Sequence, residues 1–157
     1  MKKAGVCIIE NDLGQFLLLQ RNHEPFGFCF PGGKIEDNET ILEGVIRELL
    51  EETGLSFHKP FELNEDDYVG TIKSTITNKK DYEVSIYYKR YIALFLPEVE
   101  INEESSGYIW TKKPETLNLA GNTDKMFELM IHVNRMKTDV RYNRQEKMKR
   151  ILKLKKL

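Results

Sequence analysis

GKIEDNETILEGVIRELLEETGL, residues 33–55, is the stretch that decides the fold, because a glycine-containing loop there leads into a helix. Thr40 and Glu43 match the capping-box pattern that begins a helix, and Gly54 stands where a left-handed residue ends one. Between these two ends the apolar residues recur at helical spacing. They predict one buried stripe, formed by Leu42, Val45, Ile46, Leu49 and Leu50.

Three carboxylates crowd one narrow sector of this predicted helix. At about 100° per residue, Glu48, Glu51 and Glu52 fall close together beside the apolar stripe. Like charges at this spacing destabilise a helix, and the helix dipole also disfavours them near its C-terminal end. A divalent cation would resolve this conflict, because Mg²⁺ binds through carboxylate, water and phosphate oxygens. The alternative interpretation is an ordinary solvated helix surface.

The spacing of the whole stretch resembles the signature of the Nudix hydrolases. Every defined position of that signature is filled. The positions are Gly33, Glu39, Arg47, Glu48, Leu49, Glu51, Glu52, Gly54 and Leu55. The resemblance therefore favours a metal site over a solvated surface.

The resemblance implies cleavage of a phosphoanhydride bond in a nucleoside diphosphate linked to a further group X. Family members hold Mg²⁺, or Mn²⁺, through the glutamates that match Glu48, Glu51 and Glu52. The backbone carbonyl that matches Gly32 is often a further ligand. A carboxylate of the same site, for which Glu51, Glu52 and Glu104 are the candidates, takes the proton of the attacking water.

Other motif residues are implied to be structural. Glu39 and Arg47 match the family's internal ion pair, which orients the loop against the helix, and Gly33 and Gly54 match its glycines. The fold class implied is α/β, with a mixed β-sheet between helices in an α/β/α sandwich. In the family a glutamate a few residues before a tryptophan-containing strand often completes the metal site or acts as the base. Glu104, six residues before Trp110, matches it, and Glu103 is the second choice.

The resemblance also makes three residues outside the motif candidate substrate contacts. Arg21 follows a predicted strand, where residues of several family members reach a phosphate or the base, although a polar loop is the alternative for it and for His23. Phe28 precedes the glycine loop, where an aromatic residue of the family can lie along the base; packing in the core is the alternative. Asn122 matches an asparagine that hydrogen-bonds the purine in the 8-oxo-dGTP-cleaving branch of the family, and capping of the second predicted helix is the alternative.

Two pairs of apolar, β-branched runs predict β-hairpins. Residues 4–10 and 15–21 flank the turn sequence Asn-Asp-Leu-Gly, and residues 68–77 and 82–96 flank Asn-Lys-Lys-Asp at 78–81. The chain has 157 residues, a net charge of −1 and 40% hydrophobic residues, which is typical of one soluble globular domain. Cys7 and Cys29 lack C-x-x-C spacing and predict buried free thiols.

The C-terminal part of the chain is basic. A second amphipathic helix is predicted over residues 123–136, so that the hydrolase domain comprises residues 1–137 and a basic tail or helix residues 138–157. Eight Lys or Arg residues in the tail outnumber Asp139 and Glu146. We expect this segment to fray or to pack on the domain. Binding of nucleic acid through it is conceivable but not favoured, and we expect no membrane partner.

No apolar run is long enough for a signal-peptide core or a membrane span, so we expect a cytoplasmic protein, either monomer or homodimer. The substrate favoured is a (deoxy)nucleoside triphosphate such as an oxidised purine nucleotide, cleaved to the monophosphate and pyrophosphate. ADP-ribose, a dinucleoside polyphosphate and a nucleotide sugar are alternatives. A non-catalytic nucleotide-binding module, or a hydrolase of RNA ends that uses the basic tail, would be a different class.

Overall fold

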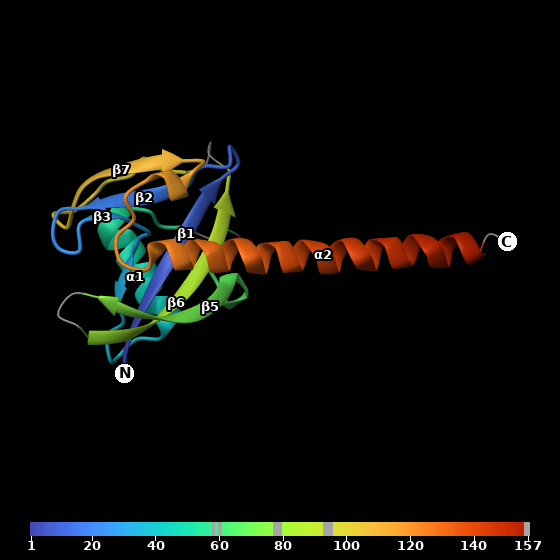
Figure 1. Cartoon of the computed structure of the whole chain (residues 1–157), viewed down its shortest axis with the longest axis horizontal. Coiled ribbons are helices and arrows are strands. Elements are labelled where there is room, and N and C mark those ends of the chain that lie inside the picture. Colours follow the sequence, from blue (N-terminus) through green and yellow to red (C-terminus); the bar gives the residue numbers. More distant parts are fainter. Residues whose placement is uncertain (58, 60, 77–79, 93–95, 156–157) are drawn as a thin grey trace.

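Seven strands form one mixed sheet with a helix on each side (Figure 1). The structure is a computed structural model that describes residues 1–57, 59, 61–76, 80–92 and 96–155. The strands are β1 (Lys2–Asn11), β2 (Phe16–Arg21), β3 (Gly27–Cys29), β4 (Gly32–Lys34), β5 (Tyr68–Ile76), β6 (Lys80–Tyr91) and β7 (Ser105–Thr111). The helices are α1 (Ile41–Thr53) and α2 (Thr123–Lys155), with short 3-10 turns at Glu65–Asp67 and Pro114–Thr116.

The long strand β1 organises the sheet. The strand order is β3-β2-β1-β6-β5, with β4 added to β1 and β7 added to β2. Strands β1 and β6 run parallel, and the other pairs are antiparallel. Both predicted hairpins are confirmed as the pairs β1–β2 and β5–β6, although residues 77–79 of the second expected turn lie outside the described residues. In the first turn, the side-chain oxygen of Asn11 accepts hydrogen bonds from the backbone N–H groups of Leu13 and Gln15, each at 3.0 Å.

Alternation along β1 divides the core into two layers, one on each side of the sheet. Ala4 and Ile8 point to the side where the first turns of α2 contribute Met126 and Met130. Cys7 and Ile9 point to the other side, where α1 packs. A two-residue period places neighbouring side chains on opposite faces, so one strand serves both layers. The predicted α/β/α sandwich with a mixed sheet is confirmed.

Helix α1 begins and ends where the sequence predicts. The Thr40 hydroxyl accepts a hydrogen bond from the backbone N–H of Glu43 at 3.1 Å, and Gly54 adopts φ 72° while its N–H donates to the Leu50 carbonyl. The predicted buried stripe is only partly correct, because Ile46 and Leu50 are 42% and 50% exposed. The face turned to the sheet is centred on Val45 and Leu49, and the other two residues lie on the outer side.

Helix α2 is longer than predicted. It does not end near Met136 but continues without interruption to Lys155, and its outer part extends away from the sheet (Figure 1). We call residues 137–155 the arm. Every residue of the arm except Glu146 is exposed, so the described residues of this segment do not pack on the domain; that the segment frays stays a prediction. Within the described part of the chain, no helix is both long and apolar enough to span a membrane.

The two cysteines differ in their surroundings. Both thiols are free, as expected. Cys7 is fully buried in the layer under α1, whereas Cys29 on β3 is only partly buried and faces a pocket.

Candidate active site

A pocket of about 450 Å³ opens between the β3–β4 segment, α1 and the beginning of α2. Its one side is acidic, since Glu48, Glu52 and Glu104 line it next to Gly32. Other lining residues are apolar and belong to one core layer, among them Phe30, Val84 and Met126, and Asn122 also lines the pocket. The pocket thus joins a site for a charged group to a site for a flat, apolar one.

The glycine loop allows α1 to approach β4 closely. A Cβ atom on Gly33 would lie 2.6 Å from the carboxyl carbon of Glu48, which is closer than such atoms approach one another. The backbone N–H of Gly32 donates a hydrogen bond to Oε1 of Glu52 at 2.8 Å. The two glycines therefore bring the backbone of the loop into contact with two carboxylates of α1.

Glu52 is the most buried carboxylate of the pocket, with 6% exposure. Burial raises its pKa to about 8, and the charges of Glu48 and Glu104 act in the same direction. The hydrogen bond from Gly32 acts in the opposite direction. The pKa of Glu48 is raised as well, chiefly by burial and against the influence of Arg47. A bound divalent cation would offset the electrostatic repulsion between these crowded, half-buried carboxylates.

Arg47 holds the loop against α1. Its Nε and Nη2 atoms donate to the two oxygens of Glu39 at 3.0 and 2.7 Å, and Nη2 also donates to the Lys34 carbonyl at 3.0 Å. The bidentate pairing with Arg47 holds the pKa of Glu39 low, at about 2. Nη1 of Arg47 lies 3.0 Å from Glu48 Oε1 and 3.2 Å from Glu51 Oε2. Arg47 thus contacts three carboxylates from one position.

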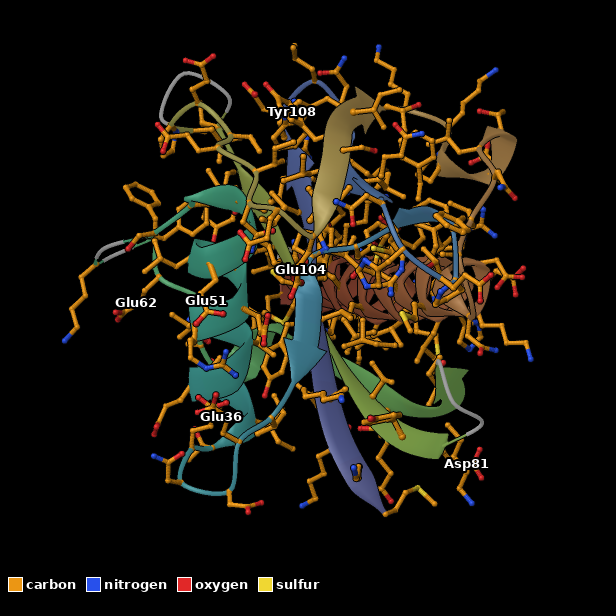
Figure 2. The ribbon with its side chains drawn as sticks, turned by 90° about the vertical axis from the view of Figure 1, so that its left-hand side faces the viewer. Glu36, Glu51, Glu62, Asp81, Glu104 and Tyr108 are labelled. Carbon is orange, nitrogen blue, oxygen red and sulfur yellow. The ribbon has the colours of Figure 1, made fainter. Side chains whose placement is uncertain are left out.

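Glu51 does not line the pocket. Its side chain is 53% exposed, and Figure 2 shows it along α1, apart from Glu104. Among the described residues, no three His, Cys, Asp or Glu side chains stand close enough to hold a metal ion as they are. Arg47 donates hydrogen bonds to Oε1 of Glu48 and Oε2 of Glu51. The donor set nevertheless suits a hard cation, because oxygen atoms of Glu48, Glu52 and the Gly32 backbone belong to one pocket wall.

Glu104 reaches the pocket from the loop before β7, while Glu103 does not line it. The loop is held by Asn22, whose side-chain amide donates to the Glu103 carbonyl and whose backbone N–H donates to the Glu104 carbonyl at 3.3 Å. Asn102 supports it from the other side, since its side-chain oxygen accepts from the Glu104 N–H at 3.1 Å.

Arg21 and His23 both line the pocket. Nε of Arg21 donates to the Pro25 carbonyl at 2.8 Å, and its Nη2 lies 2.9 Å from Nε2 of His23. Phe28 is not among the lining residues; it packs against the core layer under α2, and Phe30 lines the pocket instead.

Asn122 lies at the pocket with its side chain oriented by a distant residue. The hydroxyl of Ser74 on β5 donates to Oδ1 of Asn122 at 3.0 Å, which leaves the amide N–H₂ group for the pocket. The backbone carbonyl of Asn122 also accepts from the Met126 N–H in the first turn of α2. Sequence reasoning did not find Ser74, Tyr82 or Met126 as pocket residues, and no local pattern marks them.

Comparisons with known proteins agree on one family. The NUDIX domain model matches residues 1–130. The ADP-ribose pyrophosphatase of Methanocaldococcus jannaschii is 52% identical over 50 residues, which cover 31% of this chain and 29% of that protein. The putative 8-oxo-dGTP diphosphatase YtkD of Bacillus subtilis is 30% identical over 101 residues, covering 64% and 53% of the two chains.

These matches to the curated relatives thus span between about a third and a half of their length. Among solved structures, the MutT protein from Methanosarcina mazei superposes with a TM-score of 0.68 at 23% identity, over 87% of this chain and 94% of that one.

Proposed function

The chain belongs to the NUDIX family and is a Nudix hydrolase, and on this premise we propose that it cleaves a (deoxy)nucleoside triphosphate with an oxidised purine base to the monophosphate and pyrophosphate. The observation that carries the proposal is the composition of one pocket. Its acidic wall suits a metal-bound polyphosphate, and its apolar wall, with the Asn122 amide, suits a purine.

The polyphosphate end would require a divalent cation, as Nudix hydrolases generally do. We propose that Glu48, Glu52 and the Gly32 carbonyl hold Mg²⁺ or Mn²⁺, with Glu104 as a further ligand or the base. When bound, the metal would neutralise negative charge on the phosphoryl oxygens of the substrate and lower the pKa of a bound water molecule. Glu51 stays a candidate ligand and base at the rim of the site.

The chain's own groups perform the remaining tasks. Glu104 lines the pocket on a loop that Asn22 holds, and we propose that its carboxylate accepts the proton of the attacking water if it is not a metal ligand. The guanidinium of Arg21 supplies positive charge for a substrate phosphate at the pocket wall. At the other end, the Ser74 hydroxyl orients the amide of Asn122 so that its N–H₂ group donates to an acceptor on the base.

The test is hydrolysis of a nucleotide panel in Mg²⁺, with the monophosphate, pyrophosphate and phosphate products measured separately. We expect 8-oxo-dGTP to give the highest kcat/KM and pyrophosphate to be released. ADP-ribose is the second candidate, because the M. jannaschii relative is named for it. If ADP-ribose is instead cleaved most efficiently, to AMP and ribose phosphate, then ADP-ribose is the substrate and the assignment of the site residues still stands.

Matched glutamate variants test the site itself. Glu48→Gln and Glu52→Gln should each lower kcat by at least about 100-fold, because each removes a metal ligand. Glu51→Gln should retain more activity than either, since its carboxylate is outside the pocket lining. An equal loss in all three variants would place Glu51 among the ligands, and unchanged rates in all three would refute the site.

A further inference from the structure

We propose that the arm of one chain packs on the outer face of α1 in a second copy of this chain. The outer face of α1 is defined here by Glu43, Ile46 and Leu50. Both surfaces expose large apolar side chains, and the arm has a net positive charge whereas the rest of the chain has a net negative one.

The arm is basic and partly apolar. Residues 137–157 contain nine Lys or Arg and only two acidic residues, a net charge of +7; since the whole chain carries −1, residues 1–136 carry −8. Near its outer end, Met148, Ile151 and Leu152 recur at helical spacing and are 55%, 36% and 53% exposed. Three cations lie on or beside this apolar stripe, namely Arg144, Lys147 and Lys155. The opposite sector carries Lys149, Arg150 and Lys153 together with Glu146, which pairs with Lys149 at 3.2 Å.

The outer face of α1 has the complementary pattern. Ile46 and Leu50 are 42% and 50% exposed and lie one helical turn apart. Glu43 is exposed next to them on the same helix, and Glu51 is exposed farther around it, where it pairs with Arg47 at 3.2 Å. Figure 2 shows Glu51 on the same side of the molecule as Glu36 and Glu62, so acidic groups extend beyond the helix itself. An apolar strip bordered by carboxylates is suited to a helix with apolar and basic sides.

The arm cannot reach its own α1. Helix α2 is continuous from Thr123 to Lys155 and extends away from the sheet and from α1 (Figure 1). The partner must therefore be another molecule. The arm is long enough to cover α1, because its 19 residues span about 28 Å and the 13 residues of α1 about 20 Å. Two arms would repel each other, so pairing of arm with arm is disfavoured.

The active-site pocket stays open in such a pair. Ile46 and Leu50 lie on the side of α1 opposite to Glu48 and Glu52, which face the pocket. Hydrolysis is therefore expected to proceed in both the paired and the separate chain. This separates the inference from the proposed function, because loss of pairing leaves turnover in place.

The experiment is a charge exchange, followed by light scattering coupled to gel filtration at micromolar concentration and low salt. Wild-type protein should have twice the mass of one chain. Lys147→Glu with Lys155→Glu in the arm, or Glu43→Lys with Glu62→Lys near α1, should weaken pairing at least 100-fold and give single chains. Mixing the two variants should restore the pair, because both contacts then join opposite charges again.

The control on the same helix is Asn143→Ser with Gln145→Ser, which changes neither charge nor apolar area and should leave the mass of the pair unchanged. Circular dichroism checks that each variant keeps its helix. If wild-type protein is a single chain, or if the mixed variants stay separate, the proposal is overturned. It is also overturned if the arm variants abolish binding to phosphatidylglycerol vesicles or to single-stranded RNA while the mass of the protein remains that of the wild type.

Discussion

Replacement of Glu52 by glutamine should stabilise the fold while it abolishes hydrolysis. The side chain is 6% exposed, and burial is the main cause of the rise in its pKa from 4.5 to about 8. The folded state therefore binds the proton more tightly than the unfolded chain does, so wild-type stability falls as the pH rises from 4.5 through 8. Glutamine retains an oxygen to accept the hydrogen bond from Gly32 but carries no charge.

The size of the effect follows from the two pKa values. At about 1.4 kcal/mol per pH unit, the free energy of unfolding of the wild type should fall by roughly 3 kcal/mol between pH 4.5 and 7. Above pH 8 the loss reaches a limit of roughly 5 kcal/mol. The Glu52→Gln variant lacks this decline. Its free energy of unfolding should therefore equal that of the wild type in acid and exceed it most in mild alkali.

Urea unfolding in EDTA at about pH 5, 7 and 8.5 measures the difference. When Mg²⁺ replaces EDTA, the free energy of unfolding of the wild type should rise above pH 7. That of the variant should change little, because only the wild type retains the full set of ligands. Glu51→Gln is the control, since it removes a carboxylate that is 53% exposed but keeps Glu52, so its free energy of unfolding should fall with pH in parallel with that of the wild type. Parallel pH profiles for wild type and Glu52→Gln would refute the reasoning.

Three further expectations concern the core, the loop and the base end of the pocket. Leu49→Ala should lower the free energy of unfolding by about 2–5 kcal/mol because it leaves a cavity under α1, whereas Leu13→Ala, at a site 60% exposed, should change it by less than about 1 kcal/mol in the same urea titration. The pKa of Glu39 is held at about 2 by Arg47, so its contribution to stability is present above the unfolded value of 4.5 and lost as the pH falls toward 2; acid unfolding of Glu39→Gln should lack this component. Ser74→Ala should raise KM for oxidised purine nucleotides roughly 2- to 10-fold with little change in kcat, and an unchanged KM would remove Ser74 from the orientation of the amide.

Local patterns in the sequence determined the elements around the site. The cap at Thr40, the left-handed Gly54 and the turn at Asn11 each depend on contacts within a few residues, so their positions can be read from spacing alone. The pairing of Glu39 with Arg47 spans eight residues of a loop and a helix that succeed each other directly, and the family resemblance implied it.

Contacts between distant segments were decided only by the tertiary structure. Ser74 meets Asn122 across 48 positions, because β5 and the start of α2 border one pocket. Glu51 belongs to the same helical sector as Glu48 and Glu52, yet the rotation of α1 against the sheet leaves it outside. That same rotation buries Val45 and Leu49 and exposes Ile46 and Leu50.

Sequence alone therefore determined the family, the helix that carries the acidic residues and the strands that pair next to each other, because short-range spacing encodes them. It did not determine which carboxylates share a pocket, which residues line the base end, or that α2 continues as an exposed arm. Those features depend on how whole elements pack against one another. Helical or strand periodicity shows which residues share a face, but not which other element packs against that face.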